Sequence, residues 1–169
     1  MKKHPKLVFL IIALLILAIS AFIYKQPAAL DEIVGAPSLD GCIEFAYTSS
    51  YYADTSTFGG PFKHSEAQLR MGSEGFEEMM SLFEGKKFAR SFLPVSYKGG
   101  TVITNGSYDM TMSIFFDENE YIVINKHYDK QMWISYRNKT YRLSFDKDDP
   151  WFSDLFELMK KYEDNKIIT

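Results

Sequence analysis

The chain has 169 residues, with 22 acidic and 19 basic side chains and a single cysteine. Its first 24 residues hold three lysines and no acidic residue, so the remainder carries a net charge of −6, which argues against a nucleic-acid-binding domain. One cysteine excludes an intramolecular disulfide, so the fold must depend on its apolar core.

An uncharged run, LVFLIIALLILAISAFIY, extends from Leu7 to Tyr24. As a helix it would span roughly 27 Å, close to the hydrocarbon thickness of a bilayer. Three lysines lie before it and only Lys25 follows it directly, so the positive-inside rule places the N-terminus in the cytoplasm. The sequence therefore predicts a cytoplasmic tail over 1–6, a single pass through the lipid bilayer over 7–24, and a C-terminal part outside the cell membrane.

The same segment is also compatible with a cleaved signal sequence, which would make the protein secreted. Signal peptides have apolar regions of about 7–15 residues, shorter than this run. The nearest cleavage patterns, Ala18-Ile19-Ser20 and Pro27-Ala28-Ala29, are imperfect. The sequence favours an uncleaved anchor and leaves cleavage open.

Residues 25–41 are rich in proline, glycine and small side chains, which predicts a linker, so the folded domain is expected over 42–169. Cys42 is expected to be buried at the start of its first strand. There Ile43, Phe45 and Tyr47 alternate with more polar or smaller residues, as in a half-buried strand.

Two amphipathic helices are predicted. Ser73 is a suitable N-cap for the first, and Asp149 followed by Pro150 starts the second. Each helix has one apolar side, with residues spaced three and four apart. These sides comprise Phe76, Met79, Met80 and Phe83 in the first helix, and Phe152, Leu155, Phe156, Met159 and Tyr162 in the second.

Between the helices, residues 108–145 predict a four-stranded antiparallel meander with two-residue turns at 118–119, 128–129 and 138–139. In that register Phe116 faces Tyr121, Val123 faces Ile134 and Tyr136 faces Tyr141. The fold class is therefore α+β, a two-layer domain in which the two helices pack on a mostly antiparallel sheet. The predicted core face comprises Met110, Met112, Ile114, Phe116, Tyr121, Val123, Met132, Ile134, Tyr136, Tyr141, Leu143 and Phe145.

The same register brings apolar residues together on the opposite sheet face. An apolar patch with a polar rim is typical of a binding surface, although another segment of the chain covering it is the simpler alternative. If the patch binds a partner, changing Trp133 to alanine should abolish capture and leave thermal stability nearly unchanged. The candidate binding residues are Phe115, Ile122, Ile124 and Trp133, with Arg142 at the rim.

No catalytic constellation stands out. The chain has no G-x-S-x-G turn, no phosphate-binding glycine loop and no H-E-x-x-H helix, and its histidines lie far apart in the sequence. A pair between Cys42 and His127 is conceivable only as a contact in space. We therefore nominate no catalytic residue, no metal ligand and no cofactor.

The sequence favours a non-enzymatic binding domain, held outside the membrane, for an envelope protein or peptide. Two alternatives from other classes remain. One is an envelope hydrolase of unrecognised type, and the other is a secreted or self-associating structural protein that uses the same apolar patch.

Overall fold

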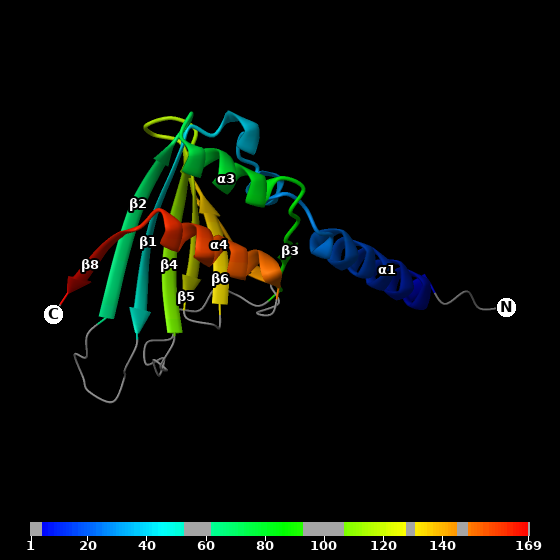
Figure 1. The fold of residues 1–169 in the computed structure, drawn as a ribbon. Coiled ribbons are helices and arrows are strands. Elements are labelled where there is room, and N and C mark those ends of the chain that lie inside the picture. The colour runs from blue at the N-terminus through cyan, green and yellow to red at the C-terminus, as the bar shows by residue number, and fades with distance from the viewer. Residues whose placement is uncertain (1–4, 53–61, 93–106, 128–130, 145–148, 169) are drawn as a thin grey trace.

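The computed structural model describes residues 5–52, 62–92, 107–127, 131–144 and 149–168. A long apolar helix, α1, leads into an antiparallel sheet with helices on one of its faces, so the α+β prediction is confirmed (Figure 1). The elements that follow α1 (Pro5–Lys25) are α2 (Leu30–Val34), a 3₁₀ turn (Leu39–Gly41), β1 (Glu44–Tyr52), β2 (Phe62–Arg70), α3 (Glu74–Phe83), β3 (Ala89–Arg90), β4 (Ser107–Phe115), β5 (Tyr121–His127), β6 (Gln131–Tyr136), β7 (Lys139–Ser144), α4 (Pro150–Lys161) and β8 (Asp164–Ile168).

The eight strands are ordered β3-β7-β6-β5-β4-β1-β2-β8. The predicted meander is present as β4 to β7, whose neighbours in the chain are also neighbours in the sheet. The hairpin of β1 and β2, each nine residues long, continues the sheet beyond β4. Strand β8, which the sequence analysis did not predict, forms one edge, while β3 forms the other, next to α1.

The predicted register of β5 is wrong by one residue on both sides. Tyr121 pairs with Phe115, where the prediction has Phe116, and Ile134 pairs with Ile124, where it has Val123. Between β4 and β5 the cause is a wider turn, in which the Asp117 side chain accepts hydrogen bonds from two backbone amides. The turn between β5 and β6, predicted at 128–129, lies outside the described residues. A slip of one residue reverses both faces of a strand.

The consequence is confined to β5. Ile122 and Ile124 are in the core at 0% exposure, whereas Tyr121, predicted to be internal, is 43% exposed. The pairing of β6 with β7 differs by two residues, with Tyr136 opposite Lys139, and a shift of two leaves each side chain on its predicted face. Strands β4, β6 and β7 therefore keep the predicted core face over the described residues, and Phe145 lies outside them.

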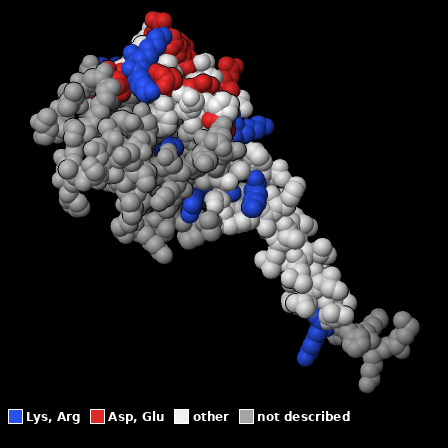
Figure 2. Space-filling model, turned by 60° about the horizontal axis from the view of Figure 1, so that its bottom comes forward, with Lys and Arg blue, Asp and Glu red and all other residues white. Residues whose placement is uncertain are grey.

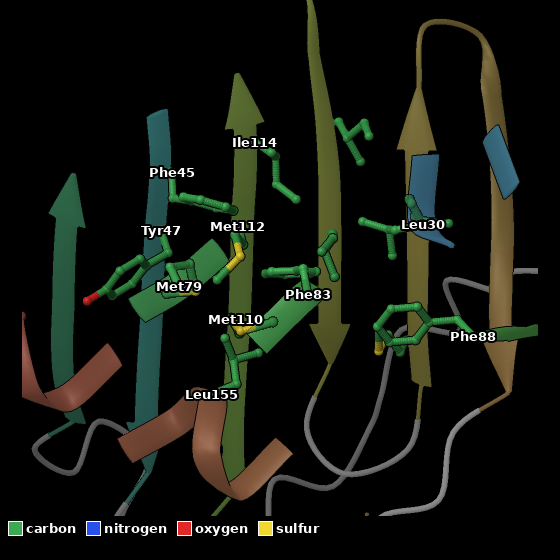
Figure 3. Packing of buried hydrophobic residues seen from close by; sticks show 14 of the residues in the cluster. Leu30, Phe45, Tyr47, Met79, Phe83, Phe88, Met110, Met112, Ile114 and Leu155 are labelled. Carbon is green, nitrogen blue, oxygen red and sulfur yellow. The ribbon is translucent and has the colours of Figure 1, made fainter. Parts of the chain in front are cut away.

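The core lies between the sheet and helices α2, α3 and α4. Both predicted helix starts are confirmed, since Ser73 and Asp149 accept hydrogen bonds from backbone amides of the first turn, at 3.2 and 3.0 Å. Figure 3 shows side chains from α3 and α4 lying over those of β4. This packing buries the apolar sides of both helices, as predicted.

The segment 25–41, predicted as a linker, belongs in large part to the folded domain. Leu30, Ile33 and Val34 of α2 are only 1–2% exposed. Ala28 also pairs with Phe88 through backbone hydrogen bonds in both directions, of 3.0 and 2.9 Å. Only residues 26 and 27 separate the end of α1 from this first attachment.

Replacing Asp149 by alanine is expected to lower the free energy of unfolding by about 1–2 kcal/mol at neutral pH, because α4 loses its cap. The variant also loses the 2.6 Å ion pair with Lys86. The hydrogen bond from the Lys86 ammonium holds the pKa of Asp149 below its ordinary value. The carboxylate therefore stabilises the fold above about pH 4, and the stabilisation is lost as the pH falls through the folded-state pKa.

Urea unfolding of both proteins at pH 7 and at pH 3 measures this effect. The difference in unfolding free energy between wild type and variant should shrink at pH 3. An equal difference at both pH values would contradict a role for the ionised carboxylate.

Candidate functional site

The predicted apolar binding surface is not assembled as expected. Ile122 and Ile124 point into the core, which leaves Phe115, Trp133 and Arg142 on the outer face, the side of the sheet away from α2, α3 and α4. Trp133 pairs with Arg142, whereas Phe115 lies four residues farther along the strands, about 13 Å away. The two aromatic residues therefore do not form one patch.

Phe115 instead lies beside Tyr121, with ring centroids 5.2 Å apart. Trp133 is only 8% exposed, although its register places it on the outer face. A side chain so deeply buried offers little area to a partner. The expectation that Trp133 anchors a partner therefore finds no support in its exposure.

The expected effect of Trp133→Ala is accordingly reversed. The substitution should lower the free energy of unfolding by about 3 kcal/mol, because truncating a buried tryptophan removes apolar contacts and leaves a cavity. Urea unfolding followed by circular dichroism measures the change, with the exposed Tyr121→Ala on neighbouring β5 as the control. An unchanged midpoint for Trp133→Ala would restore the original expectation of a binding residue.

The outer face instead contains a polar hollow of about 520 Å³ over β1, β2 and β4. Strand pairing places Gln68, Ala46 and Ser113 in one row across the sheet, and Glu66, Thr48 and Thr111 in the next. The side chains at its centre are small, which is why the surface is hollow there. The lining residues are Ala46, Tyr47, Thr48, Glu66, Ala67, Gln68, Thr111 and Ser113.

Hydroxyl and amide groups continue from the hollow across the sheet. Thr111 donates a 2.9 Å hydrogen bond to the side chain of Asn125 on β5, and Ser135 and Thr140 are hydrogen-bonded at 3.0 Å on β6 and β7. Such groups both donate and accept hydrogen bonds. The outer face is thus suited to hydrogen-bonding a polar partner rather than to burying a large apolar one.

The sequence analysis found only part of this site. The predicted core face of β4 holds Met110, Met112 and Ile114, which leaves Thr111 and Ser113 on the opposite face. The alternation in β1 likewise directs Ala46 and Thr48 outward. It did not find Glu66 and Gln68, because nothing in the local sequence of β2 identifies its partner strand. The pairing of β2 with β1 and of β1 with β4 creates the hollow.

A second polar cluster lies at the turns that join β4 to β5 and β6 to β7. The Glu120 carboxylate accepts hydrogen bonds from Tyr136 and from Arg137, the latter at 2.7 Å. The bond to Glu120 raises the pKa of the Tyr136 hydroxyl. Arg137 has a φ of 50°, so its ion pair helps to hold a strained turn. We assign this cluster a structural role.

Cys42 is not placed for nucleophilic chemistry. It is 3% exposed, as the sequence predicts for a buried residue, and burial raises the pKa of its thiol to about 11. At neutral pH it is therefore protonated and unreactive. Cys42 lies next to the end of the sheet where Glu44, Phe115 and Tyr121 pair. His127 lies at the opposite end of β5, about 20 Å from Tyr121 along the strand.

Within the described ranges, no group of three or more His, Cys, Asp or Glu side chains is arranged to hold a metal ion. Asp146, Asp148 and Glu157 have the spacing of three ligands of a calcium loop, but residues 145–148 lie outside the described residues. In the described part, Glu157 forms a 2.6 Å ion pair with Lys160.

No protein-family model, curated protein or solved structure matches the chain.

Proposed function

We propose that the chain is a membrane-anchored, non-enzymatic binding module that presents the outer face of its sheet to an envelope protein or peptide. The observation that supports this most directly is the asymmetry of the sheet. Three helices cover one face, while the other carries the polar hollow over β1, β2 and β4. Binding sites are typically concave, and polar groups placed in them fix the orientation of the ligand.

The anchor is α1. Its segment Lys6–Lys25 is long and apolar enough to cross a bilayer, and none of it is buried inside the structure. A core helix of a soluble protein would be mostly buried. The lysines before the helix favour a cytoplasmic N-terminus, so the domain would lie outside the membrane.

The strand order sets the height of the hollow above such a membrane. Strand β3 adjoins α1, and the other strands follow it in turn to β8 at the far edge (Figure 1). At about 4.8 Å per strand, β4 and β2 lie roughly 19 and 29 Å from β3. A partner in the hollow would therefore be held clear of the lipid surface.

A photo-crosslinking residue in place of Thr111 tests this proposal in whole cells. We expect a crosslinked product of defined mass from position 111 and none from position 157, an exposed site on α4. Introducing Ser113→Arg beside the crosslinker should remove the product, because the arginine side chain fills the hollow.

Equal crosslinking at positions 111 and 157, or none at position 111, would contradict a binding site on the outer face. A product with twice the mass of the chain would identify the partner as a second copy. That result would favour the self-associating structural alternative over an envelope partner.

A further inference from the structure

The end of α1 is packed against the domain through a small group of aromatic and basic side chains. We call Tyr24, Lys25, Arg90 and Phe92 the junction cluster. The rings of Tyr24 and Phe92 stack at a centroid distance of 5.1 Å and an angle of 16°. The Lys25 ammonium lies 5.1 Å from the centre of the Phe92 ring. The guanidinium of Arg90 lies 5.3 Å from the Tyr24 ring.

Arg90 is itself fixed by the domain. It donates a 3.1 Å hydrogen bond to the backbone carbonyl of Ile33 in α2 and contacts the ring of Tyr141 in β7 at 5.3 Å. The helix is thus connected to α2, β3 and β7 through one side chain. A flexible tether would show no such contacts.

The stretch of chain that connects α1 to the domain is also short. After α1 ends at Lys25, Ala28 is already hydrogen-bonded to Phe88. Three residues of extended chain cover about 10 Å at most. If α1 spans a membrane, the β3 edge of the sheet must therefore lie at the level of the lipid headgroups.

The composition of the junction suits that position. Aromatic rings and long basic side chains are the residues that favour the boundary between hydrocarbon and water. Phe92 is 55% exposed, so much of its apolar ring is in contact with solvent rather than with the core. Lys87, just before the bridged Phe88, adds an exposed positive charge.

The charged side chains of the domain are also distributed as expected for an end that faces an anionic membrane. Figure 2 shows basic side chains beside the junction with α1, whereas acidic side chains gather at the opposite end of the domain. The helices that cover the sheet contribute acidic residues that form ion pairs at the end of α4. Lys160 pairs with Glu157 of α4, and Lys161 pairs with Glu74 and Glu78 of α3. An anionic membrane surface would attract the first end and repel the second.

We infer that the junction cluster docks the domain on the headgroups of anionic phospholipids, with Phe92 at the lipid boundary and the sheet standing on its β3 edge. This inference rests on the proposed anchoring by α1. It goes beyond anchoring because it fixes the orientation of the domain and names a lipid-contacting surface.

The test uses the full chain in lipid nanodiscs of phosphatidylcholine, with or without phosphatidylglycerol. A fluorophore is attached to Phe92→Cys and, as a control, to the exposed and distant Glu74→Cys. Buried Cys42, with its raised thiol pKa, should not react, which mock labelling of the wild type verifies. We expect nitroxide-headgroup lipids to quench the label at position 92, more strongly with phosphatidylglycerol, and not at position 74.

Removing exposed basic charge tests the electrostatic part. In the Phe92→Cys background, Lys25→Gln and Lys87→Gln should each reduce the docking equilibrium by about fivefold in discs containing phosphatidylglycerol. Lys160→Gln, at the distant end of α4, should have no effect. No selective quenching at position 92 in chains that enter the discs would overturn the docking inference alone. Failure of the chain to enter the discs would overturn the anchor and the docking inference together.

Discussion

A fragment that begins at Cys42 is expected to lose most of the stability of a fragment that begins at Gln26. The longer fragment keeps Leu30, Ile33 and Val34, which are buried almost completely in the core. Burial of each such side chain contributes about 1.5–3 kcal/mol, so their removal costs roughly 5–9 kcal/mol. Whole domains are stable by only about 5–15 kcal/mol. The shorter fragment should therefore be largely unfolded.

Thermal unfolding of fragments 26–169 and 42–169, followed by circular dichroism, measures this difference. Ile33→Asp in the longer fragment should reproduce much of the loss, because it places a charge in the core. Pro37→Ala, an exposed change in the same segment, is the control. A cooperative transition at the same temperature in both fragments would show that α2 is dispensable.

The sequence predicts best those features that depend on neighbouring residues. The apolar run of α1 is visible without any tertiary information, and so are the helix caps Ser73 and Asp149, whose bonds reach only two or three residues ahead. The alternation in β4, β6 and β7 likewise identifies their core faces correctly. In each case one face or one run of residues is clearly more apolar than the other.

The prediction of the internal face of β5 is wrong because this local signal is absent there. In Tyr121-Ile122-Val123-Ile124 both faces of the strand are apolar, so alternation does not decide which face is internal. The decision then rests on the turn before it. Asp117 widens that turn by binding two backbone amides, and a wider turn changes the register by one residue.

The sequence analysis did not predict helix α2 and strand β8, because both are stabilised by contacts with residues distant in the sequence. A five-residue helix is too short to be stable alone, and proline and glycine surround its sequence LDEIV. Its apolar side chains are held by the core. The polar hollow was found only in part for the same reason, since it depends on pairing between β1, β2 and β4, which are distant in the sequence.

The junction between α1 and the domain depends on the same core. Phe88, which holds Ala28 through backbone bonds, packs edge-on against Trp151 of α4 at 5.1 Å. Trp151 also contacts Phe83 of α3 at 5.5 Å and donates a 2.7 Å hydrogen bond to the carbonyl of Leu82. One side chain thus joins α3, α4 and the segment that leads into β3.

Trp151→Ala is therefore expected to lower the free energy of unfolding by about 5 kcal/mol, near the upper end for a buried tryptophan. The loss combines a large cavity with the loss of the hydrogen bond to the partly buried carbonyl of Leu82. Trp151→Phe keeps most of the apolar contacts and should cost about 1–3 kcal/mol, mainly through that carbonyl. Urea unfolding of both variants measures the two components. Equal losses would show that the hydrogen bond, rather than the ring packing, carries the effect of Trp151.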